Sequence, residues 1–179
     1  QKGHIYIDGV DIRELSKKQL RSAIGQMQQD VFIFEGTIES NIRLHDGDIT
    51  MEQVKSAAEY VNASRFIERL PHGYKEPVTE RGVTFSAGER QLLSFARTLA
   101  HDPKILVMDE ATANIDTETE LLIQEALEKL MKGRTTIMVA HRLSTIQHAD
   151  CIMVMHKGKI RERGTHQELL AQDGIYKRL

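Results

Sequence analysis

Two adjacent carboxylates, Asp109 and Glu110, directly follow the apolar run of residues 105–108. A carboxylate at the end of a buried strand is costly unless it binds a cation or orients a water molecule. Phosphoryl chemistry uses both functions, because one carboxylate holds Mg²⁺ and another polarises the attacking water. The alternative is that both side chains only cap the turn after the strand, and the pair alone does not decide between the two.

A second candidate is the segment 85–91, Phe-Ser-Ala-Gly-Glu-Arg-Gln, which opens an amphipathic helix. Backbone N–H groups at a helix start can bind phosphate, and small residues such as Ser86 and Gly88 allow it to approach. Ser86 and Glu89 also have the Ser-x-x-Glu spacing of a capping box, which needs no ligand. Taken alone, this spacing favours the capping box.

Composition excludes several classes of protein. The chain has 179 residues, 40% of them hydrophobic, which suffices for one sizeable core. The 24 Lys and Arg residues are scattered among 26 Asp and Glu residues, so charge predicts no nucleic-acid surface. The single cysteine, Cys151, can form neither an internal disulfide nor a thiolate metal cluster. The apolar runs are far shorter than the roughly 20 residues of a membrane span, so we expect none.

The elements that must position the carboxylates follow an α/β pattern. Residues 105–108 and 135–140 are continuous apolar runs typical of strands covered on both faces, and a helix is predicted over 117–131. A strand, a helix and a strand at this spacing form a βαβ unit with parallel strands. The predicted fold class is therefore α/β, a parallel sheet with flanking helices. Ligands of such sheets bind beyond the carboxyl ends of the strands, where His141 and Arg142 follow the second run.

The remaining segments predict further small elements. Alternating residues before Asp8 and Gly9 predict a hairpin, and a capping box at Ser16 begins a short helix before a strand near 24–28. Helical signals from 37 to 70 predict a small helical lobe. The strongest helix carries an apolar stripe made of Leu92, Leu93, Phe95, Ala96, Leu99 and Ala100. Towards the end of the chain, residues 151–163 predict a β-hairpin, and Thr165 caps a terminal helix.

Together these motifs resemble the nucleotide-binding domain of ATP-binding cassette (ABC) transporters of the exporter type, over nearly the whole chain. Segment 85–89 resembles the Leu-Ser-Gly-Gly-Gln signature, and 105–110 resembles the Walker B strand with its catalytic Glu. The D-loop is matched by 111–116, the switch histidine by His141 and the Q-loop glutamine by Gln29. Each motif is weak alone, but their common order makes the resemblance specific. It implies a P-loop NTPase-like core.

The resemblance also implies ATP and Mg²⁺ as cofactors and a role for each matched residue. Glu110 is the expected general base, Asp109 the indirect Mg²⁺ ligand and His141 the sensor of the γ-phosphate. Gln29 is expected to serve both catalysis and the metal. The residues expected to bind nucleotide held by the opposite subunit are Ser86, Gly88, Glu89 and Asp116. Asp116 also stands where a residue would cap the helix that follows it.

One family motif is absent from these 179 residues. The phosphate loop Gly-x-x-x-x-Gly-Lys-Ser/Thr does not occur in them, and in family members it lies upstream of the position matching Gln1. The chain also opens without Met inside a strand-like segment. We therefore expect a partial domain that is inactive alone, with 30–100 as helical lobe and signature helix. Residues 101–179 are expected to hold the catalytic strands and the terminal hairpin and helix.

The resemblance implies two protein partners, a transmembrane domain and a second nucleotide-binding domain, at the cytoplasmic face of the cell membrane. Segment 79–82 resembles the exporter segment that touches the membrane domain, and part of 31–34 is expected to dock there, near Glu80 and Arg81. The family has Gly and Gln where this chain has Ala87 and Glu89, which favours a heterodimer. The alternative is that Glu89 turns away as a capping residue.

The resemblance implies an ATP-hydrolysing motor domain that powers export of a substrate through the transmembrane domain. Two other functions compete with this export motor. An ATPase of chromosome maintenance or DNA repair shares the signature and Walker B motifs, but the surroundings of Gln29 and His141 are exporter-like and no basic face is present. A divalent-metal hydrolase would use Asp109, Glu110 and His141. It ranks last, because the further ligands of a closed metal site are missing.

Overall fold

The computed structural model describes residues 3–28, 31–44, 46–79, 82, 84–109, 117–140 and 143–178, without the side chains of 117, 118, 143 and 144. Contacts divide the chain into two compact units, Gln1–Met138 and Val139–Leu179. None of the described helices is long and apolar enough to span a membrane.

The first unit begins with the predicted hairpin and capped helix. Strands β1 (Tyr6–Ile7) and β2 (Val10–Asp11) pair antiparallel around a turn at Asp8 and Gly9, which both have positive φ. Helix α1 (Lys17–Ala23) begins after Ser16, whose side chain forms the predicted capping box. It leads directly into β3 (Ile24–Met27), so both predictions are confirmed.

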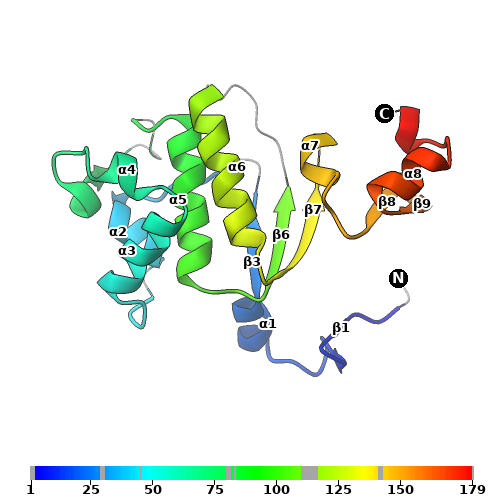
Figure 1. Ribbon diagram of the computed structural model, residues 1–179. Helices are drawn as coiled ribbons and strands as arrows, with labels where there is room; N and C mark the ends of the chain where they lie inside the picture. The colour runs from blue at the N-terminus through cyan, green and yellow to red at the C-terminus, as the bar shows by residue number, and fades with distance from the viewer. Residues whose placement is uncertain are drawn as a thin grey trace. The chain divides into compact units, whose positions relative to one another are not determined.

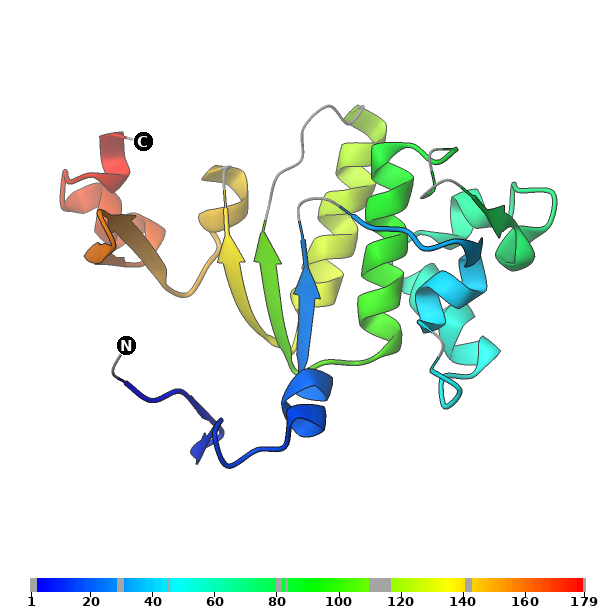
Figure 2. The same ribbon diagram turned by 180° about the vertical axis from the view of Figure 1, so that it is seen from behind.

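The central sheet of the described chain has the order β3-β6-β7, with β6 (Ile105–Asp109) in the middle. β3 and β6 are parallel, with Ile24 opposite Ile105 and Met27 opposite Met108. The arrow of β7 (Thr135–Val139) points the same way in Figure 2. The predicted α/β fold with a parallel sheet and flanking helices is confirmed.

Two long helices, α5 (Ala87–Ala100) and α6 (Thr117–Met131), lie on the same face of this sheet (Figure 1). Gly25 is where α5 and the sheet come closest, because a Cβ there would stand 2.9 Å from Thr98 Cγ2 on α5. It would also stand 2.7 Å from Pro103 Cγ, which follows the helix. The absence of a side chain at Gly25 thus allows α5 to pack against β3.

The expectation that the apolar strands are covered on both faces is wrong for the described residues. Leu106 and Met108, which face the helices, are 0% and 4% exposed. Ile137 and Val139 on β7 are 58% and 56% exposed. Because α5 and α6 both pack on one side, the alternate side chains of β7 face solvent. A continuous apolar run therefore did not reveal which of its faces is covered in this chain.

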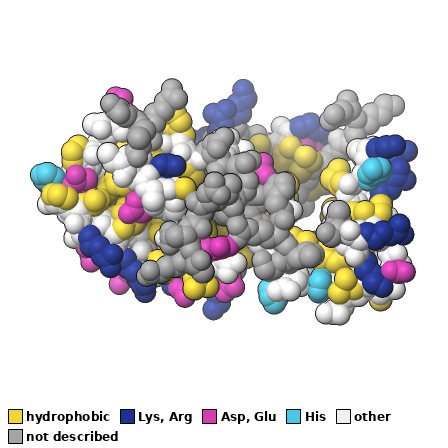
Figure 3. Space-filling model, turned by 90° about the horizontal axis from the view of Figure 1, so that it is seen from above, with side chains coloured by type: hydrophobic (Ala, Val, Ile, Leu, Met, Phe, Trp, Pro, Cys, Tyr) yellow, Lys and Arg dark blue, Asp and Glu magenta, His cyan; other side chains and the backbone are white. Residues whose placement is uncertain are grey.

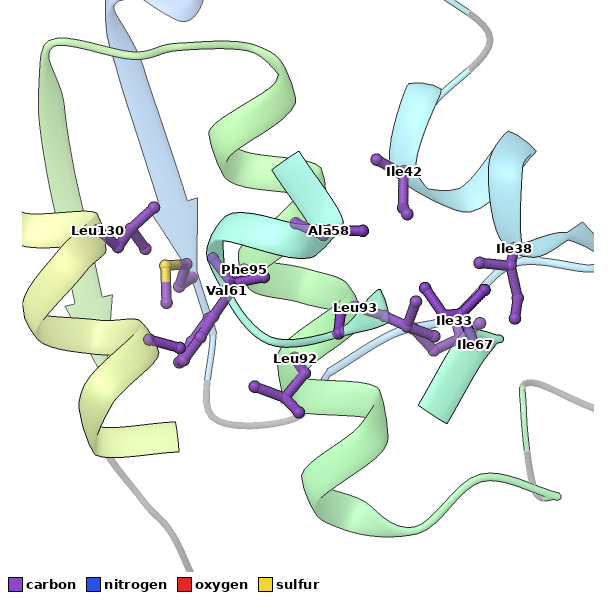
Figure 4. Packing of buried hydrophobic residues seen from close by; sticks show 14 of the residues in the cluster. Ile33, Ile38, Ile42, Ala58, Val61, Ile67, Leu92, Leu93, Phe95 and Leu130 are labelled. Carbon is purple, nitrogen blue, oxygen red and sulfur yellow. The ribbon is translucent and has the colours of Figure 1, made fainter. Parts of the chain in front are cut away.

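The predicted helical lobe consists of α2 (Ile38–Arg43), α3 (Met51–Tyr60) and α4 (Ser64–Ile67), packed around α5. Thr37 and Thr50 cap α2 and α3 with capping boxes. Figure 4 shows the resulting core, in which side chains of these helices meet those of α5 and α6. The labelled members are Ile33, Ile38, Ile42, Ala58, Val61, Ile67, Leu92, Leu93, Phe95 and Leu130.

The segment before α5, which has no periodic pattern, contains two elements that the sequence did not predict. One is the short 3₁₀ helix η1 (Gly73–Lys75). The other is β5 (Pro77–Val78), which pairs antiparallel with β4 (Gly36–Thr37). This pairing joins the start of α2 to the segment that leads into α5.

The second unit contains the predicted C-terminal hairpin and helix. Strands β8 (Ile152–His156) and β9 (Lys159–Gly164) pair antiparallel, and α8 (His166–Ala171) begins after the capping residue Thr165. The unit also includes α7 (Leu143–Ile146) and η3 (Tyr176–Arg178). Its small core is made of Ile152, Val154, Leu169 and Tyr176.

Candidate functional site

The first candidate carboxylate lies at the carboxyl end of the central strand. Asp109 is the last residue of β6, and its side chain is exposed, whereas that of Met108 is 4% exposed. The parallel strand β3 ends beside it, since Met27 is opposite Met108. Figure 3 views the molecule from the side on which these strands end. The topology thus places Asp109 at the sheet edge where ligands of α/β proteins bind.

Several predicted site residues lie outside the described part of the chain. They are Gln29, Glu110, Asp116 and His141, together with Asp30, Glu80, Arg81 and Arg142. In the sequence, Gln29 follows β3, Glu110 follows β6 and His141 follows β7, each within two residues of the strand's last residue. The roles of these residues stay predictions.

The start of α5 forms a complete capping box. The backbone N–H of Glu89 donates to Ser86 Oγ at 3.1 Å, and the backbone N–H of Ser86 donates to Glu89 Oε2 at 2.8 Å. Ser86 and Ala87 are exposed, whereas Gly88 is buried. The capping box is therefore the arrangement found for Glu89, and the exposed Ser86 and Ala87 form the accessible surface of the helix start.

Contacts behind the helix start hold it in place. Phe85 is 5% exposed, and its ring meets that of Phe66 edge to face, with centroids 6.2 Å apart. Arg90 donates through Nη1 to the Phe85 carbonyl oxygen at 2.6 Å. An anion that approaches Ser86 therefore meets a helix start with a buried anchor rather than a frayed end.

The described residues can supply only part of a metal site. Among them, no three His, Cys, Asp or Glu side chains gather closely enough to hold a metal ion. Mg²⁺ usually takes one or two protein carboxylates and completes its octahedron with water and phosphate oxygens. Asp109 fits this use, because its carboxylate is exposed at a strand end. The closed ligand set that the metal-hydrolase alternative requires is not found in this part of the chain.

The comparisons with known proteins decide the family. A family model described as "ABC transporter" matches residues 1–113. The chain belongs to the ABC transporter family. The matched residues include segments 85–91 and 105–109, which hold the two candidate sites described above.

Relatives and a solved structure show which kind of ABC domain it is. The chain is 55% identical over 179 residues to exp8 of Streptococcus pneumoniae, assigned to the ABC transporter ATP-binding proteins. It is 54% identical over 176 residues to the "Probable multidrug resistance ABC transporter ATP-binding/permease protein YheH" of Bacillus subtilis. A bacterial Atm1-family ABC exporter solved with ATP bound matches 99% of the chain with 43% identity and a TM-score of 0.88. The chain is a nucleotide-binding domain of the exporter type.

The ABC domain matches only part of these proteins. The match to exp8 covers the whole of this chain but 30% of exp8, and the match to YheH covers 98% of this chain but 26% of YheH. The match to the solved exporter covers 31% of that chain. The named relatives are transporters, so the alternative of a DNA-repair ATPase has no support among them.

Segment 31–34 of this ABC domain divides into core and surface. Ile33 is 1% exposed and lies in the core near Leu93 and Ile67 (Figure 4). Its neighbours Phe32 and Phe34 are 48% and 45% exposed, and their rings meet edge to face with centroids 4.8 Å apart. The sequence left both core and docking open, and the alternation along the segment buries Ile33 and leaves Phe32 and Phe34 exposed.

Gly82, from the exporter-like segment 79–82, is buried and lies against Ile33. A Cβ on Gly82 would stand 3.1 Å from Ile33 Cβ, and Gly82 has a φ of +73°. The backbone N–H of Gly82 donates to the Thr79 carbonyl oxygen at 2.9 Å, which closes the turn. Two segments that the sequence linked to the membrane domain thus meet through Ile33 and Gly82.

The sequence did not predict the role of Arg97, which forms three long-range hydrogen bonds beside Phe32 and Phe34. Arg97 lies on α5, and its guanidinium donates to Asn41 and to the Phe32 carbonyl oxygen. The available signal was a single cation between the apolar residues Ala96 and Leu99 in the stripe that faces the core. A charged residue in that position indicates either that the edge of the helix is exposed or that a buried polar group pairs with the charge. Here Asn41 is the buried polar partner.

Proposed function

We propose that this domain binds and hydrolyses ATP as the motor of an exporter, whose transmembrane domain moves the substrate. The observation that carries the proposal is the exposed Asp109 at the carboxyl end of the parallel strand β6, with Glu110 next in the chain. Buried strands that end in adjacent carboxylates suit metal-assisted phosphoryl transfer. The exporter-type relatives support the same conclusion.

At the strand ends, each predicted residue has a task, and Gln29 has two. Glu110 accepts the proton of the attacking water as general base, and Gln29 and His141 orient that water and the γ-phosphate. Asp109 and Gln29 would hold Mg²⁺. When bound, Mg²⁺ neutralises charge on the phosphate oxygens. The order of Gln29, Glu110 and His141 after β3, β6 and β7 supports this division of tasks.

The start of α5 serves the nucleotide of a second domain. Its exposed Ser86, the buried Gly88 and the positive end of the helix suit a phosphate that approaches from outside. Glu89 and Asp116 complete the expected contact set. ATP held between two such domains draws them together, and hydrolysis releases them. In this proposal, residues 30–100 contribute the lobe and signature helix, and residues 101–179 contribute the catalytic strands and terminal elements.

The transmembrane domain docks against the exposed rings of Phe32 and Phe34. Adjacent exposed aromatic side chains indicate an interaction surface, because a lone domain gains nothing from exposing them together. Gly82 lies beside Ile33, and Glu80 and Arg81 precede it in the sequence. This docking places the domain at the cytoplasmic face of the cell membrane.

Measurement of phosphate release tests the motor function. The intact parent, meaning the full-length polypeptide that contains this domain, should release phosphate from Mg-ATP. The 179 residues alone should not, because they contain no phosphate-loop string to hold the β- and γ-phosphates. Calorimetry with Mg-ATP should give no low-micromolar binding to them. An intact parent without ATPase activity would overturn the proposal.

A finer proposal concerns the second domain, which we infer to be a different chain. Ala87 adds a methyl group where the family has Gly, at an exposed position of the helix start. Glu89 brings the negative charge of its carboxylate to the Ser86 N–H group, where it repels an approaching phosphate. A partner with an unmodified signature would complete the site built on Glu110.

Expression with and without candidate partners tests the unequal pair. The parent should have low ATPase activity alone and higher activity with its partner. The double substitution Ala87→Gly with Glu89→Gln should raise the activity of the parent alone. Full activity of the parent alone, with no gain from either change, would rule the unequal pair out.

A further inference from the structure

Arg97 uses its whole guanidinium to join three segments that are distant in sequence. Nε donates to the Asn41 carbonyl oxygen at 2.8 Å, Nη2 donates to Asn41 Oδ1 at 3.1 Å, and Nη1 donates to the Phe32 carbonyl oxygen at 3.0 Å. The guanidinium carbon also lies 5.5 Å from the centre of the Phe34 ring. A single side chain of α5 thus contacts α2 and both exposed aromatic residues.

Asn41 completes the connection, because its amide pairs with the backbone of Phe34 in both directions. The Phe34 N–H donates to Asn41 Oδ1 at 2.8 Å, and Asn41 Nδ2 donates to the Phe34 carbonyl oxygen at 2.8 Å. Asn41 is 1% exposed, so these bonds form away from water. The buried side-chain amide of Asn41 satisfies both the N–H and the carbonyl group of Phe34, and it thereby fixes the path of the backbone at Phe34.

The charge of Arg97 is held by carbonyl oxygens and by a ring face. Among the described residues, no carboxylate forms an ion pair with it, and burial lowers the pKa of Arg97 to about 10. Burying this cation is costly, and its partners are neutral. The planar fork of Arg suits the site, because Nε, Nη1 and Nη2 each meet their own oxygen. Lys keeps the charge but cannot form these bonds together.

We propose that Arg97 is a positioning residue, which holds Phe32 and Phe34 in their exposed places and makes them move together with the signature helix. Ser86 and Arg97 lie on the same rigid helix, about 16 Å apart along its axis at 1.5 Å per residue. A shift of Ser86 on the nucleotide of the second domain is therefore carried to the aromatic pair. The inference rests on the proposed function, in which that pair meets the transmembrane domain.

The test compares Arg97→Lys with Arg134→Lys in the intact parent. Arg134 is a matched control, since its Nε and Nη1 donate to the carbonyl oxygens of Pro103 and Leu130 and it has no contact with the aromatic pair. Arg97→Lys should lower kcat at least fivefold and leave KM for ATP within twofold, because Arg97 is remote from the nucleotide. Arg134→Lys should leave both constants within twofold.

A double-substitution cycle then asks whether Arg97 acts through the rings. Replacement of Phe32 and Phe34 by Ala should lower kcat to a similar degree, and adding Arg97→Lys should cause no further loss. Losses that multiply would overturn the inference, as would an Arg97→Lys variant with wild-type kcat. An inactive wild-type parent would instead contradict the proposed function.

Hydrogen exchange of the intact parent separates positioning from unfolding. Arg97→Lys should speed exchange of the amide N–H of Phe34 and leave the middle of α5 protected. Arg134→Lys should leave exchange at Phe34 unchanged. Uniform loss of protection along α5 would show that Arg97 only stabilises the fold, and this result would also overturn the inference.

Discussion

The end of β6 and the start of α5 both carry residues that we propose for contact with a nucleotide, but the two places are built in different ways. At the end of β6, Asp109 is exposed and its position depends on the pairing of β6 with β3, far away in the sequence. At the start of α5, four consecutive residues satisfy one another, since Ser86 and Glu89 exchange two hydrogen bonds.

Because of this difference, substitutions at the end of β6 and at the start of α5 should affect activity and stability in different proportions. The Asp109 side chain is exposed at the strand end, so changes to it should alter activity at little cost in stability. The residues at the helix start both cap α5 and face the expected nucleotide, so changes there should alter both. Substitutions at the two places can therefore break or sharpen the comparison.

The largest effect is expected at the strand end. Glu110→Gln in the intact parent should slow ATP turnover by roughly 10² to 10⁴, because the amide keeps the shape but cannot accept a proton. Steady-state phosphate release measures this. Glu128→Gln, at an exposed position on α6, is the control and should leave turnover unchanged. A near-normal rate for Glu110→Gln at its own site would show that another group is the base.

A change at Gly25 should disturb both places by separating the helix from the sheet. The Cβ of Gly25→Ala would stand 2.7 Å from Pro103 Cγ and 2.9 Å from Thr98 Cγ2. Such overpacking costs about 1–3 kcal/mol of unfolding free energy. Urea denaturation measures it, with Gly47→Ala as control, because no atom lies within 4 Å of a Cβ at Gly47. Equal stability of the two variants would contradict the close packing of α5 on β3.

Loss of the cap at Ser86 should change stability and activity together. Ser86→Ala removes the acceptor of the Glu89 N–H group and should cost about 1 kcal/mol of unfolding free energy. In the intact parent it should also lower turnover several-fold. Ser16→Ala is the matched control, because Ser16 caps α1 with the same capping-box geometry. It should cost similar stability and leave turnover unchanged, and equal turnover losses would refute the special role of Ser86.

The smallest effect on the fold is expected for Glu89→Gln. The amide oxygen can still accept from the Ser86 N–H group, so the unfolding free energy should change by less than about 0.5 kcal/mol. Thermal and urea unfolding measure this change. A loss above about 1 kcal/mol would show that the negative charge itself stabilises the start of α5 through the helix dipole.

The sequence predicted the elements whose signals are local. The capping boxes identified in it at Ser16 and Ser86, and the helix cap at Thr165, are present, because such a cap is complete within four residues. The parallel arrangement of β6 and β7 (Figure 2) was also predictable, since a βαβ connection allows few topologies.

Three features that the sequence did not predict depend on distant partners. The pairing of β4 with β5 joins strands of two residues each, too short for a periodic pattern. The bonds of Arg97 reach Asn41 and Phe32, which are 56 and 65 residues away. The uncovered face of β7 depends on which side α5 and α6 occupy, which an apolar run does not encode. For Gln29, Glu110, Asp116 and His141, the sequence and its family resemblance remain the basis of the site.

The most direct test of the account is equilibrium binding of ATP to the intact parent, with and without Mg²⁺. The account predicts that Glu110→Gln binds Mg-ATP as the wild type does, whereas Asp109→Asn binds Mg-ATP at least tenfold more weakly and metal-free ATP unchanged. Asp109→Asn should also unfold with a free energy within about 0.5 kcal/mol of the wild type, because its side chain is exposed. Asp109→Asn with wild-type affinity for Mg-ATP would contradict the assignment of the strand end as the metal-dependent half of the site.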